Sequence, residues 1–553
     1  MTYAELYKYG RRIAASLQEH GFRKGQLAAV VMERGISQIT AIYGILLAGG
    51  CYVPLSGGQP DMRLEKIFSS LNIGYAVTDS ENAQKWNGIK CIIYEDAENS
   101  TAEYIPADIS PDDSAYIIMT SGSTGTPKGV EIRHGSAMNT IYDINKRISA
   151  SADSKILGVS ATDFDLSVYD IFGMSSVGGE LCILTRQNAK DADFWVDVLK
   201  ENNIDAWNSV PVLFDMLLTS AERRGVSLPI RTVMLSGDWI GIPLVKRYNK
   251  ILPDSVMLAM GGATEASIWS NVFMVPKELP DHWKSIPYGN ALTAQMYRIT
   301  DRLGRDCPDW TTGELLIGGA GVAKGYYGDA ELTKNKFSEE NGLIWYHTGD
   351  NGRFWSDGTI EFLGRKDFQV KVSGHRIELG EIESAAEQCE GINRAAAAVY
   401  EKNGIKKIAL FYTSEQGADT DEKKLLSLLE KRIPGYMLPK TFIRLESFSV
   451  TANGKLDRKN LVVTDYEKNE TAVPENFTET EKKLSRIWEN NLNTAIRDRS
   501  DDYFETGGNS LKATGMVYEI NEEFGIKFKI SMIFRYSSLR DMAAQIDRLC
   551  MEG

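Results

Sequence analysis

The sequence predicts an α/β protein in three parts: a large N-terminal subdomain with mostly parallel sheets, a small α+β subdomain, and a helical bundle. Over the first two-thirds of the 553 residues, apolar strand-like runs alternate with segments of helical period, which is typical of βαβ units. After about residue 364 the segments become shorter and more charged, and residues 479–553 are periodic as helices. A chain of this length fits three or four folding units.

The alternation begins at the start of the chain. Leu6, Ile13 and Leu17 recur at helical spacing and predict a helix over residues 4–17 that stops near Gly21. Apolar runs at 26–32 and 51–55 predict buried strands. Helices are also predicted at 38–48, 62–71, 194–201 and 212–218, and strands or extended segments at 74–79, 115–119, 157–160, 206–210, Thr232–Leu235 and 255–260.

Polar and glycine-rich residues gather where four of these strands end. The strand at 157–160 leads to Asp165, the strand Thr232–Leu235 leads to Ser236 and Gly237, and the strand at 255–260 leads to Gly261. The strand at 206–210 lies between them in the chain. Because ligands bind at the carboxyl edge of open parallel sheets, we expect a ligand site there.

The C-terminal third divides at a polar segment. Residues 463–478 contain Pro474 and lack periodicity, so they are predicted to form a linker. Before the linker, the α+β segment ends near Leu461. After it, helical period at 481–488, 511–524 and 539–549 predicts a small bundle.

Composition argues against several classes of function. Lys and Arg number 62 against 75 Asp and Glu, and the net charge of −13 argues against nucleic acid as the main partner. No apolar stretch is long enough to span a bilayer, and no secretory signal opens the chain. The six cysteines are scattered without a C-x-x-C pair, which indicates reduced thiols, and we expect a cytoplasmic protein.

A loop rich in glycine and hydroxyl residues follows the apolar strand at 115–119. Residues 120–129 read Thr-Ser-Gly-Ser-Thr-Gly-Thr-Pro-Lys-Gly. Glycines let backbone N–H groups approach a phosphate, the hydroxyls add donors, and Lys128 adds positive charge. The Walker A pattern does not fit these residues. An exposed surface loop is the alternative, but Pro-Lys-Gly directly after a buried strand favours anion binding.

This loop resembles the signature of the adenylate-forming (ANL) superfamily, and in particular the adenylation domains of nonribosomal peptide synthetases. The resemblance extends along nearly the whole chain. The C-terminal bundle resembles a peptidyl carrier domain, because Gly-Gly-Asn-Ser at 507–510 is similar to a phosphopantetheine attachment site. Further matches lie, in chain order, at 1–6, 47–54, 164–167, 313–315, 346–350, 364–371, 376–383, 434–439 and 453–458.

The resemblance implies a domain organisation. An adenylation domain would comprise an N-terminal subdomain at 1–366 and a mobile C-terminal subdomain at 367–462, with Asp367 as the hinge. The linker at 463–478 would lead to a four-helix carrier domain at 479–553. Ser510 would carry 4′-phosphopantetheine, attached by a phosphopantetheinyl transferase; taken alone, it would read as an ordinary N-cap serine. Met1 lies inside the opening motif, so we expect a piece of a longer synthetase with a neighbouring condensation or cyclisation domain.

The resemblance also implies how ATP and Mg²⁺ are bound. The glycine-rich loop would hold the β- and γ-phosphates, Thr264 would contact the α-phosphate, and Glu265 would help to hold Mg²⁺. Asp350 would bind the ribose hydroxyls beside Arg365. Lys455 would bridge the substrate carboxylate and the α-phosphate. The implied catalytic residues are Lys455, Glu265 and Thr264, and the implied ATP-binding residues are Thr120, Ser121, Gly122, Ser123, Thr124, Gly125, Lys128, Gly237, Gly261, Gly262, Thr264, Glu265, Asp350, Arg365 and Lys455.

The same resemblance locates an amino-acid pocket. Asp165 would pair with the ligand ammonium, which favours an α-amino acid over a fatty or aryl acid. Bulky walls leave space for a small side chain, and methionine and aromatic neighbours suit a thiol. The set resembles that of cysteine-activating domains in modules that make thiazolines, so L-cysteine is favoured, while pocket size alone also permits Ser, Thr, Ala or Val. Its members are Asp165, Leu166, Tyr169, Asn208, Met234, Ser236, Met260, Ile268, Trp269 and Lys455.

The chain departs from the family pattern where adenine would bind. Many relatives have an aromatic residue before Gly-Pro-Thr-Glu, whereas this chain has Gly261, and Ala259 replaces a polar residue expected to bond the base. Apolar contacts and backbone groups would then hold adenine instead. Besides the adenylation–carrier didomain, two other hypotheses are open: a coenzyme A-type acid ligase, against which Asp165 and the carrier motif argue, and a catalytically idle carrier scaffold.

Overall fold

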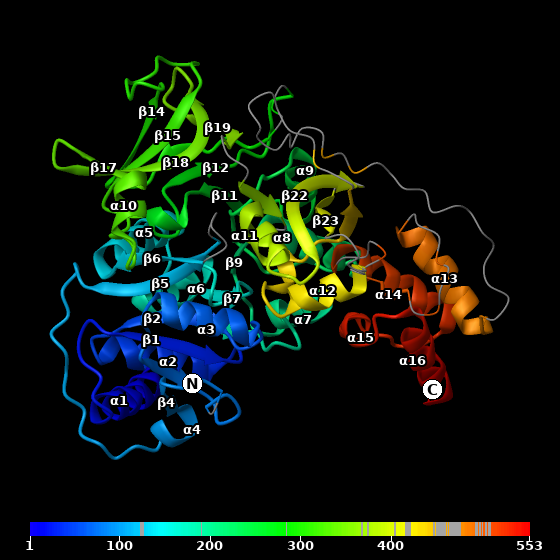
Figure 1. Cartoon of the computed structure of the whole chain (residues 1–553). Coiled ribbons are helices and arrows are strands. Elements are labelled where there is room, and N and C mark those ends of the chain that lie inside the picture. The colour runs from blue at the N-terminus through cyan, green and yellow to red at the C-terminus, as the bar shows by residue number, and fades with distance from the viewer. Residues whose placement is uncertain are drawn as a thin grey trace.

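The computed structural model describes residues 1–83, 85–121, 127–189, 191–281, 283, 285–365, 369–372, 375–402, 405–414, 422–445, 448, 461, 463, 477–492, 496, 499, 501–503, 506 and 510–552. Figure 1 shows the N-terminal elements in blue to green, the small subdomain in yellow-green and yellow, and the C-terminal helices in orange and red. Within these ranges, every helix is too short or too polar to cross a lipid bilayer.

The first layer is a seven-stranded sheet in the order β16-β6-β5-β2-β1-β3-β4. Every residue of β1 is buried, as expected for a strand covered on both faces. Helix α1 begins after Thr2, which forms a capping box with Glu5. The strands are β1 (Leu27–Met32), β2 (Cys51–Ser56), β3 (Tyr75–Thr78), β4 (Lys90–Ile93), β5 (Ser114–Thr120), β6 (Lys128–Arg133) and β16 (Gly325–Tyr326), and the helices are α1 (Tyr3–Glu19), α2 (Ile36–Leu47), α3 (Asp61–Ser70) and α4 (Tyr94–Ala97).

The second layer is another seven-stranded sheet, in the order β13-β12-β11-β10-β9-β7-β8. Its central strands are parallel, while β12 pairs antiparallel with β11 and β13. The strands are β7 (Lys155–Gly158), β8 (Glu180–Ile183), β9 (Ala206–Ser209), β10 (Thr232–Leu235), β11 (Val256–Gly261), β12 (Asn271–Met274) and β13 (Asn290–Ala291), and the helices are α5 (His134–Arg147), α6 (Leu166–Val177), α7 (Ala192–Glu201), α8 (Pro211–Arg224) and α9 (Ile242–Ile251).

An antiparallel sheet completes the N-terminal subdomain. Its order is β14-β15-β18-β17, and β19 pairs with β18. Figure 1 shows these strands together, above the second sheet. The elements are β14 (Gln295–Thr300), β15 (Gly313–Gly319), α10 (Ala330–Lys336), β17 (Phe337–Glu340), β18 (Leu343–Phe354) and β19 (Ile360–Arg365).

The small subdomain contains a hairpin and a three-stranded sheet with their own core. Two helices pack with these strands, and Ile377, Ile382 and Leu410 are among the fully buried core residues. The elements are β20 (Gln369–Val372), β21 (His375–Glu378), α11 (Leu379–Glu387), β22 (Ile392–Lys402), β23 (Ile405–Ser414), α12 (Glu422–Glu430) and β24 (Thr441–Arg444).

The C-terminal helices form a bundle around an aromatic pair. Trp488 and Tyr503 meet edge to face with ring centroids 5.3 Å apart, and both are fully buried. Helix α14 contacts α8 of the N-terminal subdomain. The helices are α13 (Glu479–Leu492), α14 (Ser510–Phe524), α15 (Ile530–Arg535) and α16 (Leu539–Glu552).

The predicted α/β fold with a small second subdomain and a helical bundle is confirmed. Each strand and helix predicted in the first two-thirds is present, with ends shifted by a few residues and with α8 extending to Arg224. The alternation did not indicate the antiparallel sheet of β14, β15, β17, β18 and β19 or the antiparallel strand β12, because most of these strands follow one another without a helix between them. Most of the predicted linker lies outside the described residues.

Candidate active site

Four parallel strands bring the predicted site residues to one edge. In the second sheet β11, β10, β9 and β7 are consecutive neighbours, and their pairings are all parallel. Their carboxyl ends therefore lie side by side, and the residues that follow these strands gather at one edge of the sheet. Asp165 follows β7, Asn208 lies near the end of β9, Ser236 follows β10, and Thr264 follows β11.

Asp165 and Thr264 meet across this edge. Asp165 precedes α6 and is only 5% exposed. The Thr264 hydroxyl donates a hydrogen bond of 2.7 Å to Oδ2 of Asp165. The residue predicted to bind the substrate ammonium thus contacts the residue predicted to bind the α-phosphate, which is the adjacency that joining a carboxylate to a nucleotide requires.

The remaining described residues of the predicted amino-acid pocket are buried together. Ser236 accepts a hydrogen bond of 2.9 Å from the Trp269 indole N–H. The rings of Tyr169 and Trp269 pack with centroids 5.3 Å apart, and the Tyr169 hydroxyl donates a hydrogen bond of 2.8 Å to Oδ1 of Asn145. Leu166, Tyr169, Met234, Met260, Ile268 and Trp269 belong to one apolar cluster. Lys455, the last predicted member, lies outside the described residues.

The segment that carries Ile268 and Trp269 has an unusual backbone. Ser267 and Ile268 have φ of 57° and 70°, a region that a β-branched residue rarely adopts. The Thr140 hydroxyl donates to the Ser267 carbonyl at 3.0 Å, and the Gln295 amide donates to the Trp269 carbonyl at 3.0 Å. These bonds hold the strained segment from α5 and β14, and thereby fix the pocket wall.

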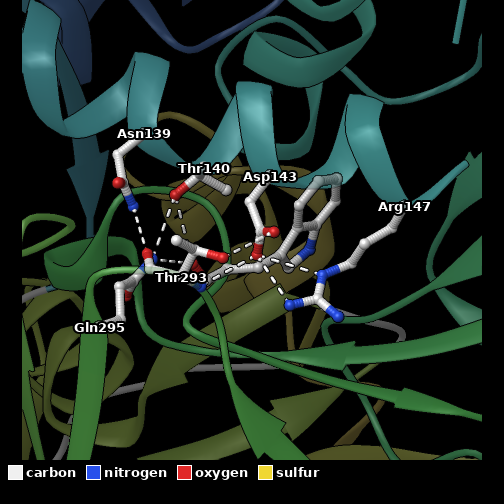
Figure 2. A network of polar contacts seen from close by, with 7 residues as sticks. Asn139, Thr140, Asp143, Arg147, Thr293 and Gln295 are labelled. Atoms are coloured by element: carbon white, nitrogen blue, oxygen red, sulfur yellow. Dashed lines mark hydrogen bonds and ion pairs between the residues drawn. The ribbon is translucent and has the colours of Figure 1, made fainter. Parts of the chain in front are cut away.

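Figure 2 shows the polar network that supports this arrangement. Asp143 of α5 accepts hydrogen bonds of 3.0 Å from the backbone N–H and the hydroxyl of Thr293, and it also pairs with Arg147 at 3.1 Å. Asn139 donates to the Thr293 carbonyl at 3.0 Å. Hydrogen bonds and the Arg147 charge hold the pKa of Asp143 below its usual value although burial opposes them. The network ties the loop before β14 to α5.

A second buried acid lies behind the pocket. Asp170 of α6 is 2% exposed and accepts a hydrogen bond of 2.8 Å from the Asn208 amide. Burial raises the pKa of Asp170 to about 7, although Asn208 and the Arg34 guanidinium oppose the rise. Asp170 was not among the sequence-predicted residues, because a single acid in an apolar helix carries no pattern that separates it from its neighbours.

Substituting Asp170→Asn is expected to change how stability depends on pH. Since the folded protein holds the Asp170 proton more tightly than the unfolded chain, the free energy of unfolding falls as pH rises from about 3.8 to about 7. The rise in pKa corresponds to about 4 kcal/mol. The Asp170→Asn variant should lack this pH-dependent part of the free energy of unfolding, which urea unfolding from pH 4 to 8 measures. Parallel pH profiles for the two proteins would contradict the assignment.

The predicted phosphate loop is described at both ends. Thr120 ends β5, and its hydroxyl donates to the Lys128 carbonyl at 3.3 Å. Ser121 is buried, and its hydroxyl accepts a hydrogen bond of 3.0 Å from the Glu378 backbone N–H. The middle of the predicted loop, Gly122, Ser123, Thr124 and Gly125, lies outside the described residues.

Glu265 and Lys128 both contact Tyr326. Glu265 is fully buried and accepts a hydrogen bond of 2.6 Å from the Tyr326 hydroxyl, and the Lys128 ammonium lies 5.0 Å from the centroid of the same ring. Within the described residues no cluster of three or more His, Cys, Asp or Glu side chains could hold a metal. Mg²⁺ usually takes one or two carboxylates together with substrate phosphates, so a single carboxylate at Glu265 fits that ion.

A cavity of about 740 Å³ lies at the carboxyl ends of β10 and β11. Gly237, Gly261 and Arg365 line it, and Arg365 donates a 2.7 Å hydrogen bond to Oδ1 of Asp350, which is its direct partner across β18 and β19. This volume suits a nucleotide-sized ligand. Gly262 follows Gly261 with φ of 151°, where an added Cβ would lie 2.8 Å from the Ser270 backbone nitrogen.

Several residues of this cavity were missed by sequence reasoning. Tyr288, Phe362 and Asn271 line it, and burial raises the pKa of the Tyr288 hydroxyl well above its usual value, with the Asp350 carboxylate adding to the effect. None of the three lies in a motif that was recognised. The one indirect indication in the sequence was that Gly261 stands where many relatives have an aromatic residue, so another group would have to contact the base.

The small subdomain covers the same region. Arg63 of α3 and Glu381 of α11 form an ion pair between the two subdomains in which the side chains are 5% and 2% exposed. The ring of His375 in β21 stacks on the ring of Tyr436 with centroids 3.9 Å apart. Its centroid lies 6.3 Å from that of Phe164, the residue before Asp165 in the chain. The hairpin β20–β21 therefore borders the predicted site. The predicted hinge, Asp367, lies outside the described residues.

Ser510 is the first residue of α14. The N-terminus of a helix carries a partial positive charge and backbone N–H groups without intrahelical partners, so it favours a phosphate group. This position fits a phosphopantetheine phosphodiester.

Comparisons with known proteins agree with this arrangement. Residues 1–327 match the family described as AMP-binding enzyme, and residues 482–546 match the family described as phosphopantetheine attachment site. The chain therefore belongs to the AMP-binding enzyme family, and it carries a phosphopantetheine attachment domain after the adenylate-forming domain. This order is that of an adenylation–carrier pair of a nonribosomal peptide synthetase.

Individual relatives are of the same kind. The chain is 44% identical over 561 residues to the anguibactin system regulator of Vibrio anguillarum, covering 99% of this chain and 53% of that protein. It is 42% identical over 400 residues to pyochelin synthetase PchE of Pseudomonas aeruginosa, covering 72% and 28%. Holo-PA1221, a solved NRPS protein containing adenylation and PCP domains bound to a vinylsulfonamide inhibitor, superposes with a TM-score of 0.81 at 25% identity over 99% of this chain and 92% of that one. The chain thus spans about half the length of the first relative.

Proposed function

We propose that this chain activates L-cysteine with ATP as cysteinyl-AMP, releasing pyrophosphate, and then transfers the aminoacyl group to its own carrier domain. The observation that carries the proposal is the 2.7 Å hydrogen bond between Asp165 and Thr264, which brings the residue proposed to bind the substrate ammonium against the residue proposed to bind the α-phosphate. The domain boundaries we propose are 366/367 for the subdomains and 463–478 for the linker to the carrier.

The proposed roles of the described residues follow from their positions, and the role of Lys455 follows from the family resemblance. Asp165 binds the substrate ammonium, so that the substrate carboxylate points toward Thr264 and the α-phosphate. Lys128 offsets phosphate charge, and Lys455 stabilises the charge that develops on the carboxylate and the α-phosphate during in-line displacement. Glu265 holds Mg²⁺, which neutralises phosphate charge when bound. The phosphopantetheine arm, when attached at Ser510, supplies the thiol that receives the aminoacyl group as AMP leaves.

Cysteine is favoured by the pocket wall. The walls formed by Tyr169, Met234 and Trp269 are fully buried and bulky, so the substrate side chain must be small. Methionine sulfur and aromatic rings suit a soft, weakly polar thiol. Serine, threonine, alanine and valine have a similar size and are the competing substrates. One relative is named pyochelin synthetase, which supports the assignment of this chain to a synthetase.

Two kinds of partner follow from the proposal. A phosphopantetheinyl transferase must modify the carrier domain. Neighbouring condensation or cyclisation domains would use the loaded amino acid, and the regulator from Vibrio anguillarum has about as much chain again outside the matched region.

Amino-acid-dependent pyrophosphate exchange over the proteinogenic amino acids tests the proposal. We expect a clear maximum for cysteine. A maximum for another amino acid would support the reaction class but overturn the assigned substrate. If the protein still bound ATP but catalysed exchange with none of the amino acids, the reaction class would be overturned.

Lys455→Ala is expected to lower exchange at least about 100-fold, because the positive charge acts on the transition state. Lys440→Ala, at an exposed lysine of the same subdomain, is the matched control and should retain exchange. Equal exchange in the two variants would mean that the Lys455 charge does not act on the transition state.

A further inference from the structure

Two side chains from elsewhere in the fold lie against Gly261. In β11 this glycine stands where many relatives have an aromatic ring. A methyl group added to its Cα would lie 3.1 Å from Cζ of Tyr288 and 3.0 Å from Oδ1 of Asn271. Tyr288 and Asn271 both line the nucleotide-sized cavity. The space that a side chain at position 261 would take is thus filled by a ring and an amide from other segments.

The Tyr288 ring has a backing partner and a fixed backbone. It stacks on Phe362 with centroids 5.0 Å apart and an interplanar angle of 10°. Its backbone N–H donates to the Ile360 carbonyl at 3.0 Å, and the Ile360 N–H donates to the Gly289 carbonyl at 2.7 Å. Gly289 has φ of 84°, and an added Cβ would lie 2.3 Å from the Val272 carbonyl oxygen. The ring is therefore held against β19, the strand that also carries Arg365.

Asn271 offers a buried hydrogen-bond acceptor at the same place. It lies directly opposite Gly261 in the antiparallel pairing of β11 and β12, and it is 0% exposed. Its Nδ2 donates to the Tyr297 hydroxyl at 2.7 Å. Its Oδ1 has no hydrogen-bond partner among the described residues. A buried acceptor left unpaired is costly, so a ligand that donates to it gains affinity.

We propose that Tyr288 and Asn271 form the purine subsite of this enzyme. The ring of Tyr288, backed by Phe362, stacks on the base, and Oδ1 of Asn271 accepts a hydrogen bond from the exocyclic amino group of adenine. The pair takes the place of the aromatic and polar side chains that many relatives have where this chain has Gly261 and Ala259. A base with a carbonyl in place of the amino group would set two acceptors against each other, so Asn271 selects adenine. The inference rests on the proposed use of ATP.

The stacking role is tested by direct titration of ATP binding to the full chain. Since stacking on one aromatic ring contributes strongly to base binding, Tyr288→Ala should weaken ATP binding by about 10- to 100-fold. Tyr288→Phe keeps the ring and should recover most of the affinity. Tyr142→Ala, at an exposed tyrosine of α5, is the matched control. ATP affinity of Tyr288→Ala within about twofold of the wild type would overturn the role of Tyr288.

An exchange of positions sharpens this test. Gly261→Phe alone should weaken ATP binding, because the new ring collides with Tyr288. The double variant Gly261→Phe with Tyr288→Ala moves the ring to the position usual in relatives, and it should bind ATP more tightly than either single variant. If the double variant lost as much ATP affinity as the two single variants together, the proposal that Tyr288 replaces a ring at position 261 would be overturned.

The role of Asn271 is tested with purine riboside triphosphate, which lacks the amino group. The wild type should prefer ATP, and Asn271→Leu should bind the two nucleotides about equally. Tyr297→Phe removes the hydrogen bond from Asn271 Nδ2 without removing Oδ1, so it should keep the preference and controls for disturbed packing. Equal binding by the wild type would overturn the role of Asn271. If the protein bound nucleotides with this preference but catalysed no amino-acid-dependent exchange, the purine subsite would stand and the proposed function would be overturned.

Discussion

Replacing Ser510 with alanine is expected to abolish attachment of phosphopantetheine to this chain. The serine hydroxyl oxygen is the atom that would form the phosphodiester, so no neighbouring group can substitute for it. Alanine is a strong helix former, and position 510 begins α14, so the bundle around Trp488 and Tyr503 should persist. The loss should therefore be complete without loss of the carrier fold.

The measurement is the intact mass after incubation with coenzyme A and a phosphopantetheinyl transferase. The wild type should gain the mass of one arm, and Ser510→Ala should gain none. Ser537→Ala, in the same bundle, is the matched control and should gain the arm. A mass gain in Ser510→Ala would place the attachment site at another residue. Amino-acid-dependent pyrophosphate exchange, which needs no arm, should persist in all three proteins.

The parallel edge of the second sheet could be predicted because each of its strands carries a local signal. Apolar runs of four to six residues precede Asp165, Ser236 and Gly261, and βα alternation requires parallel pairing. In the sheet the order β11-β10-β9-β7 sets these strand ends side by side, and the polar residues gather at one edge. Here pattern and topology point to the same site.

Contacts between segments distant in sequence could not be predicted in the same way. Asn271 meets Gly261 only because β12 turns back antiparallel, and Tyr288 reaches Gly261 only through its hydrogen bonds to β19. The positive φ of Ile268 has no sequence signal, since a glycine would ordinarily mark it. These features depend on tertiary packing, and they decide the shape of both the pocket and the nucleotide cavity.

The Asp165 carboxylate is expected to determine recognition of the amino acid. It is 5% exposed, so a substrate ammonium opposite it is largely removed from water. Removing one partner of such a pair leaves the other charge buried and costs about 2–5 kcal/mol. Asp165→Asn keeps an oxygen that can accept from Thr264, so the substitution removes charge and little else. We expect kcat/KM for the amino acid to fall by about 30- to 5000-fold, with the KM for ATP little changed.

Pyrophosphate exchange at varied amino acid and at varied ATP separates the two constants. Asp163→Asn is the matched control, because this acid lies two residues away and accepts a hydrogen bond of 2.9 Å from Gln59 instead. Its amino-acid KM should show no comparable rise. A second readout is 3-mercaptopropionate, which has the cysteine thiol and carboxylate but no ammonium: the wild type should discriminate strongly against it, and Asp165→Asn should not. Unchanged discrimination in Asp165→Asn would mean that another group binds the ammonium, and the pocket would have to be assigned to a different face of the cavity.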